Sequence, residues 1–572
     1  MRTTLWILAM AGGALFLRTV TGCGSSGSSA HGAQGGHGGQ GGHGGHGGHG
    51  GASSSAGGGT GTGSQGGGGT VPVTTHPTNI LANGGFELGM MCFGEYVQPD
   101  GNGDYGFFLS TDAHSGKYAL ELRCLGPSCA SSFNDRAFVI TQGFHAPASQ
   151  GYKLTVWSRC DAGADAFWYT ESSSVQYLSK ALECTGSWAE NEIHFISQAK
   201  DAEATFYFYN HSVGSLFLDD AVLTYEDGTV PPHTVKYPGV RSVVTKDSHL
   251  EVDGKPYLAL GFFNVPYSEL PTVAAITGAN VVTTLGSQAL ADCFNTDRGP
   301  YADRARDLGL DVVPDTTTTA RLGVPEVFPA VMDAFAPHLA NIGFYLADEP
   351  DQAFYKYSLI APQTMAAERA AAHTRSALPL LADLQHAHYD PPAVDKPFQD
   401  SEDIYGSEPY QEDTSGLTQT FAVFSTMIKR PVWIFDDNHK DVTTVVPKAY
   451  FSVILGATGV VYFDWSSLDD MNRAADAQAI GELSSLKDVI FAADATVKVT
   501  APPGVAFIAR ESGGKTYVIA VNGTAQPVQG SFTVTGLKST TGAVMFESRS
   551  VNVSGGSFSD SFTGIARHVY VL

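Results

Sequence analysis

The sequence predicts a multidomain protein in which an all-β sandwich is followed by a (β/α)8 barrel and then by a small C-terminal β-sandwich. Two observations predict this architecture. From residue 237 to 495, eight apolar strand-like runs alternate with helical runs such as RGPYADRARDLGL, which fits the count and the length of a (β/α)8 barrel. In residues 77–230 and 496–572, short strands separated by turn residues show no helical period.

The first 22 residues have the pattern of a secretory signal peptide. Arg2 precedes an apolar run from Leu5 to Leu17, which is too short to span a bilayer. The sequence VTGC, residues 20–23, follows and resembles the lipobox of bacterial lipoproteins, although Arg18 interrupts the apolar run before it. The resemblance implies that residues 1–22 are removed, that Cys23 is lipidated, and that the protein is exported and anchored to the bacterial outer membrane or cell surface.

Residues 23–76 are predicted to form a flexible tether, because repeats such as GGHGGHGGHGG have no apolar surface to bury. The chain as a whole is acidic, with a formal net charge of −24. Binding to nucleic acid or to an anionic membrane requires a basic surface, so we expect neither partner. Neutral ligands such as sugars fit this charge. We expect a monomer whose membrane contact is the lipid anchor alone.

Residues 77–230 are predicted to form the first β-sandwich, because YKLTVWSRC, ATFYFYNHS and LFLDDAVLTYED have the lengths and patterns of strands. This segment resembles a jelly-roll carbohydrate-binding module in three motifs: NILANGGFELG, DAHSGKYALEL and FLDDAVLTYEDG. The resemblance implies glycan binding through aromatic side chains and a structural calcium ion. The candidate aromatic ligands, each of which also suits a core position, are Trp157, Trp168, Tyr169 and Trp188.

Six cysteines remain after Cys23, and an exported protein meets an oxidising compartment. None of them shows the CxxC spacing of a metal or redox site, so disulfides are predicted. Cys160 and Cys184 lie at the ends of predicted strands and are candidates for one pair. Cys124 and Cys129 are candidates for another.

The eight predicted barrel strands are apolar on both faces, as expected of a parallel sheet covered by helices. In chain order they cover residues 256–265, 280–286, 311–317, 342–350, 379–385, 403–410, 430–438 and 459–467. The active site of such a barrel lies at the C-terminal ends of its strands. The residues there are Asn264, Asp348, Glu349, Asp383, Glu408, Tyr410, Asp436, Asp437, Asp464 and Trp465.

Carboxylates mixed with aromatic residues at these strand ends favour a sugar-cleaving site. The predicted barrel has no GxGxxG, P-loop, HExxH or serine-centred elbow, so we expect no cofactor or metal in catalysis and no esterase chemistry. We assign Asn264, Asp383, Glu408 and Asp464 to substrate binding. Tyr410 and Trp465 either stack on sugar rings or line the barrel wall.

The barrel resembles glycoside hydrolases related to clan A in DGKPYLALGFF, TGANVV, YADRARDLGLDVV, GFYLADEPD and GATGVVYFDW. The resemblance implies that Glu349, at the end of strand four, is the general acid/base. It also implies a nucleophile at the end of strand seven, where this chain offers Asp436 or Asp437 in place of the usual Glu. A second departure is Asp348, which stands where the clan has Asn.

Two alternatives to a retaining glycosidase remain open. The Asp348–Glu349 pair also resembles that of substrate-assisted β-N-acetylhexosaminidases, in which the Asp orients the substrate acetamide and the Glu is the acid. Successive strand residues face opposite ways, so both side chains reach the substrate only if the strand bulges or ends at Asp348. The other alternative is a non-catalytic glycan-binding surface lipoprotein with a degenerate barrel, which the missing strand-seven Glu favours.

Overall fold

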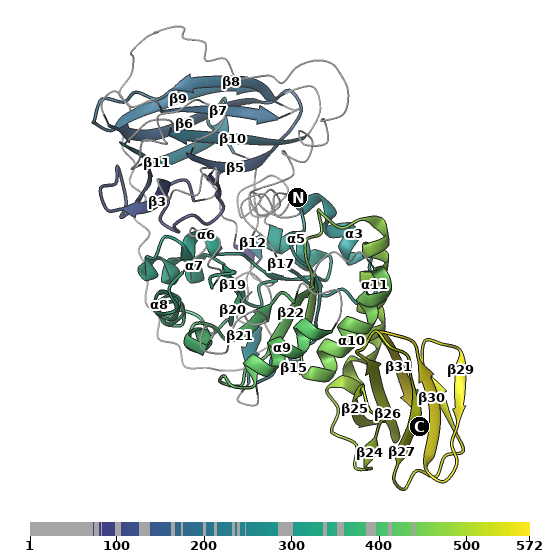
Figure 1. The fold of residues 1–572 in the computed structure, drawn as a ribbon. Helices are drawn as coiled ribbons and strands as arrows, with labels where there is room; N and C mark the ends of the chain where they lie inside the picture. The colour runs from purple at the N-terminus through teal and green to yellow at the C-terminus, as the bar shows by residue number, and fades with distance from the viewer. Residues whose placement is uncertain are drawn as a thin grey trace.

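The computed structural model describes residues 72–73, 79–81, 83–97, 105–124, 138–161, 166–172, 175–197, 202–210, 214–230, 235–236, 241–245, 248–283, 301–335, 340–351, 360–384, 396–409, 414–436 and 441–572. The predicted signal peptide, Cys23 and nearly all of the predicted tether lie outside these residues. Among the helices that are described, none combines the length and the apolarity needed to cross a membrane. Figure 1 shows the N-terminal sheets, the barrel and the C-terminal sheets following one another along the molecule.

The N-terminal unit contains two five-stranded antiparallel sheets. In spatial order, the first contains β2 (Gly94–Val97), β5 (Phe138–Ala146), β10 (Ala202–Asn210), β7 (Ala166–Ser172) and β8 (Val175–Ala181). The second contains β3 (Tyr105–Ser110), β4 (Ala119–Cys124), β11 (Gly214–Tyr225), β6 (Gly151–Cys160) and β9 (Ala189–Ile196). A two-stranded ribbon pairs β1 (Pro72–Val73) with β12 (Val235–Lys236).

A single apolar core joins these two sheets. Along β6, buried and half-exposed residues alternate without interruption, so that Leu154 and Val156 face inward. They belong to one cluster with Leu122 of β4 and with Phe208 of the other sheet. A disulfide bond between Cys160 and Cys184 confirms the first predicted pair. Cys129 lies outside the described residues, so the pair with Cys124 stays a prediction.

The calcium ion expected in this sandwich stays a prediction as well. Two acidic side chains of the opening and closing motifs accept hydrogen bonds from backbone N–H groups. Glu87 accepts them from Lys117 and Tyr118. Asp219 accepts them from His114 and Ser115. Within the described part of the sandwich, no three carboxylate, histidine or cysteine ligands converge on one point.

The central unit is an eight-stranded, all-parallel barrel, which confirms the predicted fold of this region. Each predicted strand segment contains one of its strands: β16 (Ala259–Phe262), β17 (Val281–Thr283), β18 (Asp311–Val313), β19 (Phe344–Asp348), β20 (Leu380–Asp383), β21 (Ile404–Ser407), β22 (Val432–Asp436) and β23 (Gly459–Tyr462). Hydrogen bonds between β18 and β19 close the barrel. The Tyr345 N–H donates to Pro314 O at 2.8 Å, and the Thr316 N–H donates to Tyr345 O at 2.7 Å.

Two apolar clusters fill the two sides of the barrel wall. The interior cluster takes one or two residues from every strand, among them Tyr345, Leu381 and Trp433. Leu250 and Val252 of a three-stranded sheet also belong to this interior cluster. That sheet consists of β13 (Ser242–Val244), β14 (Leu250–Val252) and β15 (Lys255–Pro256). The other apolar residues of the strands, such as Leu260 and Leu380, pack outward against the helices.

The helices of the barrel surround the strands (Figure 1). They are α3 (Leu270–Ala274), α5 (Tyr301–Asp307), α6 (Thr317–Ala320), α7 (Phe328–Phe335), α8 (Pro362–Ala372), α9 (Ser415–Phe424), α10 (Val445–Leu455) and α11 (Asp470–Ile490). Short 3-10 turns are η2 (Tyr267–Glu269), η3 (Pro325–Val327), η5 (Lys396–Asp400) and η6 (Val442–Thr444).

The C-terminal unit consists of two antiparallel sheets around a core of their own. One contains β24 (Val499–Thr500), β27 (Val528–Val534) and β30 (Ser557–Phe562). The other contains β25 (Val505–Ser512), β26 (Lys515–Asn522), β31 (Ala566–Val571), β28 (Thr541–Val544) and β29 (Arg549–Asn552). Ile519 and Val569 join the helix-side cluster of the barrel, and Arg567 pairs with Glu482 of α11 at 2.6 Å. This unit is therefore attached to the barrel by both apolar and ionic contacts.

A buried carboxyl on α8 gives the first testable prediction. Glu368 is fully buried, and within the part of the chain that the structure describes neither of its oxygens has a hydrogen-bond partner. Burial raises the pKa of Glu368 to about 9. The folded protein therefore binds this proton more tightly than the unfolded chain, and stability falls as pH rises from about 4.5 towards 9. Glu368→Gln, which stays neutral, should gain about 3 kcal/mol over the wild type at pH 7 and nearly nothing near pH 4.5. Denaturant unfolding at several pH values measures this difference, and a gain that is independent of pH would contradict it.

Candidate active site

Strand alternation decides which side chains reach the interior at the barrel mouth. On β20, Leu381 belongs to the interior cluster, so Asp383, two residues later, faces the same way. On β21, Ile404 belongs to that cluster, and Glu408 follows four residues later. Both carboxylates therefore point into the barrel at the C-terminal ends of their strands.

The end of β19 departs from simple alternation. Tyr345 pairs with Leu381 and Asp348 pairs with Asp383, so β19 has one more residue than β20 between these two pairs. This irregularity turns Asp348 to the same side as Tyr345, three residues before it. The next residue, Glu349, has φ = 45°, in the left-handed region that a non-glycine residue seldom adopts. The strand thus bulges between Tyr345 and Ala347 and ends at Asp348. Under this condition the side chains of Asp348 and Glu349 can both reach one site.

Three carboxylates converge at this point. Asp348, Asp383 and Glu408 each place an oxygen within 4.8 Å of the others. Their exposed fractions are 5%, 0% and 1%. The Tyr345 hydroxyl donates a hydrogen bond to Asp348 Oδ1 at 2.8 Å. Among the described residues, no N–H or hydroxyl group donates to either oxygen of Asp383 or to Glu408 Oε2, and the hydrogen bond these carboxyls can form is a proton shared between them.

The electrostatics of this cluster favour its neutral forms. Burial, followed by the charge of Asp315, raises the pKa of Asp348 to about 6, against the opposing effects of the Tyr345 hydrogen bond and Arg321. Burial and the neighbouring carboxylates, Glu349 among them, raise the pKa values of Asp383 and Glu408 well above their ordinary range. Carboxylates this close cannot all be ionised together, so the cluster holds protons or another cation at neutral pH. Perturbed carboxyls in a barrel mouth are typical of catalytic sites.

The two strand-seven candidates do not join this cluster in the described structure. Phe435 fills the interior, so Asp436 faces the helices, where Lys448 Nζ of α10 contacts its Oδ1 at 2.8 Å. Both side chains of this ion pair are almost fully buried. The structure therefore places Asp436 in the wall between β22 and α10. Asp437 lies outside the described residues.

The strand-one and strand-eight candidates form a separate polar group. The Asn264 amide donates to Asp464 Oδ1 at 3.2 Å, and the hydroxyl and backbone N–H of Ser466 donate to the same oxygen. Trp465 is 2% exposed, and its ring packs edge-on against Phe262 at 4.8 Å. The guanidinium of Arg473 lies 4.6 Å from its ring centroid. Trp465 therefore belongs to the wall, and its ring has no free face on which a sugar could stack.

Sequence reasoning missed several residues that shape the site. In the sequence, Tyr345 is simply one residue of an apolar strand. Nothing in the sequence indicates that the charges of Asp315 and Arg321 act on Asp348 at the end of strand four. The sequence also gives no sign of the ion pair between Lys448 and Asp436. The only sequence signal for Tyr345 is a polar-tipped aromatic three residues before Asp348, which becomes informative once the bulge is known. Tyr410 lies outside the described residues. So do the segments 284–300, 352–359, 385–395 and 437–440, which follow four of the strands at this end.

A second candidate surface lies on the N-terminal sandwich. Trp157 is on the outer face of β6, where the ring of His114 stacks on it at 3.6 Å. The centroid of the Trp188 ring lies 5.9 Å from that of the same histidine ring. The guanidinium carbon of Arg159 lies 5.8 Å from the centroid of the Trp188 ring. Neither tryptophan belongs to the core of the sandwich. The side chains of Trp168 and Tyr169 are outside the described part of the chain.

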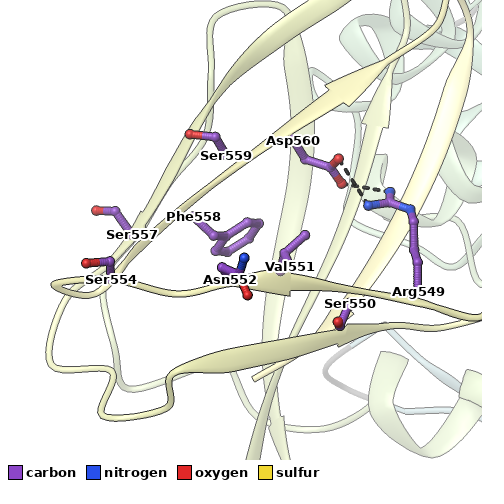
Figure 2. Close-up of a pocket in the computed structure, with 9 residues that line it drawn as sticks. All are labelled: Arg549, Ser550, Val551, Asn552, Ser554, Ser557, Phe558, Ser559 and Asp560. Atoms are coloured by element: carbon purple, nitrogen blue, oxygen red, sulfur yellow. Dashed lines mark hydrogen bonds and ion pairs between the residues drawn. The ribbon is translucent and has the colours of Figure 1, made fainter.

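The C-terminal sandwich carries an open hollow of about 490 Å³ between β29 and β30. Figure 2 shows that an ion pair between Arg549 and Asp560 stands at one end and that Ser554 and Ser557 lie at the other. Phe558 and Val551 lie between them (Figure 2). This hollow has a single carboxylate, which is already paired, so it offers no acid–base chemistry of its own.

Comparison with known proteins adds the following. No family model matches the chain, and no curated protein matches it. Among solved structures, a GH30 endoxylanase from Clostridium papyrosolvens C71 is 14% identical over 55% of this chain and 96% of its own, with a TM-score of 0.36. An Anoxybacillus α-amylase is 11% identical over 54% of this chain and 89% of its own, with a TM-score of 0.38. TmCBM61, in complex with β-1,4-galactotriose, is 20% identical over 26% of this chain and 99% of its own, with a TM-score of 0.20. At these values the chemistry has to be argued from the residues of the site.

Proposed function

We propose that this chain is a surface-anchored glycoside hydrolase that cleaves a poly- or oligosaccharide, with Glu349 as the general acid/base. One observation carries the proposal. Asp348, Asp383 and Glu408, from three consecutive strands, come together at the C-terminal end of the barrel, burial raises the pKa of each, and the charge of Glu349 acts on Asp383 and Glu408. Glycoside hydrolysis needs a carboxyl that holds a proton beside another that remains charged, and such a cluster supplies both.

The reaction assigned to Glu349 has two steps. Its carboxyl protonates the glycosidic oxygen as the bond to the anomeric carbon breaks, and the resulting carboxylate then takes a proton from the attacking water. In a retaining reaction, a strand-seven carboxylate attacks the anomeric carbon first. Because Asp436 is engaged by Lys448, the candidate for that role is Asp437.

A substrate-assisted reaction is the second candidate, and two observations favour it. The bulge of β19 turns Asp348 to the interior beside Glu349, and Asp436 is turned away. In that reaction Asp348 orients the acetamide of an N-acetylated sugar, whose oxygen attacks the anomeric carbon. Loss of activity in Asp348→Asn on N-acetylated substrates alone marks this route. Loss in Asp437→Asn with rescue by azide marks the retaining route.

The alternative from another class is a glycan-binding surface protein with an inactive barrel. Incubating the purified protein with a panel of plant, fungal and bacterial glycans separates the two classes. New reducing ends indicate the hydrolase. Glycan binding without any new reducing end indicates the binding protein.

The N-terminal sandwich is expected to bind glycan by itself, since residues 79–228 supply every buried member of one apolar core except Leu322 of the barrel and contain a disulfide. The outer-face aromatic group of Trp157, Trp188 and His114 is the proposed contact. Removing an aromatic stacking partner typically costs about 1 kcal/mol, or roughly fivefold in affinity. Affinity electrophoresis of this fragment and its Trp188→Ala variant measures the effect. Unretarded migration in every glycan gel would leave the sandwich with a structural role only.

Lipid anchoring through Cys23 is part of the same proposal, and its support is the VTGC motif after an apolar run. Stable anchoring needs at least two acyl chains, which a lipidated N-terminal cysteine provides. Cys23→Ala should therefore move the protein from the membrane fraction to the soluble fraction. Membrane partitioning that does not change in the variant would refute the anchor.

A further inference from the structure

We propose that Asp348, Asp383 and Glu408 form a binding site for a calcium ion at the mouth of the barrel. This goes beyond the hydrolase reaction, for which the sequence predicts no metal. The three residues come from the ends of β19, β20 and β21, which are hydrogen-bonded neighbours in the barrel wall. The rigid part of the fold thus brings the three carboxylates together.

The spacing of the oxygens fits one ion. Calcium binds oxygen at about 2.3–2.6 Å, so two ligands on opposite sides of the ion lie about 4.6–5.2 Å apart. One oxygen from each of the three carboxylates lies within 4.8 Å of the other two. A point equidistant from three oxygens this close lies no more than about 2.8 Å from each of them, so small side-chain rotations bring all three to one calcium ion.

The unpartnered oxygens of Asp383 are the second observation. Asp383 is completely buried, and among the described residues its oxygens and Glu408 Oε2 accept no hydrogen bond from any N–H or hydroxyl group, so that their one partner is a proton shared between the two carboxyls. A buried carboxylate without a partner is costly. Glu368 is in that position and burial raises its pKa, so it stays neutral, whereas two other buried carboxylates of this chain are paired. Asp436 is paired with Lys448, and Asp403 with Arg369 and His373. A cation between the three strand ends can replace the shared proton as the partner of Asp383.

The chemistry of the ligands selects calcium. All three ligands are carboxylates, the hard oxygen donors that calcium, magnesium and manganese prefer. Magnesium usually keeps several waters and takes one or two protein carboxylates, whereas calcium accepts six to eight oxygens and binds carboxylates in bidentate fashion. Three buried carboxylates can supply up to six oxygens.

Binding can be measured without any glycan substrate. The full-length protein is stripped with a chelator and titrated with Ca²⁺ by calorimetry, and in parallel with Tb³⁺, whose luminescence is sensitised by nearby aromatic rings. The Tyr345 hydroxyl is hydrogen-bonded to Asp348, so an ion in this site lies beside a sensitiser. We expect Tb³⁺ luminescence that Ca²⁺ displaces, a rise in unfolding temperature with Ca²⁺, and release of protons on binding.

Variants locate the site. Asp383→Asn and Glu408→Gln keep the shape of the side chain and remove one ligand charge, so each should weaken Ca²⁺ binding by at least about 100-fold. Glu368→Gln, a buried carboxyl on α8, is the control that leaves binding unchanged. Because the two neutral variants remove charge repulsion, their chelator-treated forms should unfold at a temperature no lower than that of the chelator-treated wild type.

Two results would overturn the proposal. Wild type that takes up no Ca²⁺ or Tb³⁺ would show that the cluster is neutralised by protons alone. Unchanged affinity and stoichiometry in both Asp383→Asn and Glu408→Gln would place any bound ion elsewhere, for example in the N-terminal sandwich. Both readouts are independent of hydrolysis, so a protein that is inactive on every glycan still tests this site.

Discussion

Glu349→Gln is expected to lower turnover by about 10²–10⁴-fold while substrate affinity changes little. The amide has the shape of the carboxyl and still fills the space at the end of β19, but it can neither donate a proton to the leaving oxygen nor take one from water. The loss should therefore appear in kcat, with KM close to that of the wild type. Steady-state kinetics on the best substrate of the glycan panel measures this division.

Glu368→Gln is the matched control for this variant. It is the same substitution at another fully buried glutamate, which lies on α8 and not at a strand end. Its turnover should equal that of the wild type. A Glu349→Gln enzyme with undiminished kcat would remove Glu349 from the reaction and leave GFYLADEPD as a polar strand end.

Lys448→Met is expected to lower the free energy of unfolding by about 3–5 kcal/mol, because it removes one partner of a buried ion pair. Asp436 would remain in the wall between β22 and α10 without the ammonium group that now pairs with it. Denaturant unfolding followed by circular dichroism measures the change.

The double variant Lys448→Met with Asp436→Leu is the control for the ion pair. It replaces both charges by apolar side chains of similar size and should regain most of the lost stability. If Asp436 has only this structural role, folded Asp436→Asn should have the turnover of the wild type. Azide should not change the turnover of this variant. A Lys448→Met protein as stable as the wild type, or an inactive Asp436→Asn protein that azide rescues, would contradict the structural assignment.

The barrel itself could be predicted from the sequence because its signal is repeated eight times. Each apolar run is followed by polar residues and a helical segment, and every one of the eight predicted segments contains an observed strand. The disulfide between Cys160 and Cys184 could be proposed for a similar reason, because both residues lie at strand ends. Asp383 and Glu408 were found by the same rule, which looks for polar residues where a barrel strand ends.

The direction of individual side chains could not be predicted. In RPVWIFDDN, either Asp436 or Asp437 suits the interior, and only the inward packing of Trp433 and Phe435 shows that Asp436 faces α10. The bulge in β19 depends on its hydrogen bonds with β20, a strand more than thirty residues later, so no local pattern reveals it. The wall position of Trp465 depends in the same way on distant partners, Phe262 and Arg473.

Hydrolysis in ¹⁸O-labelled water tests the central claim most directly. Each cleaved glycosidic bond takes one oxygen from water into the product, so mass spectrometry counts cleavage events without assuming a sugar or a linkage. Wild type should release labelled oligosaccharides from at least one glycan of the panel, and Glu349→Gln should do so at no more than about 1% of that rate. Folded wild type that labels no glycan, or equal labelling by Glu349→Gln, would contradict the assignment of this barrel as a glycoside hydrolase acting through Glu349.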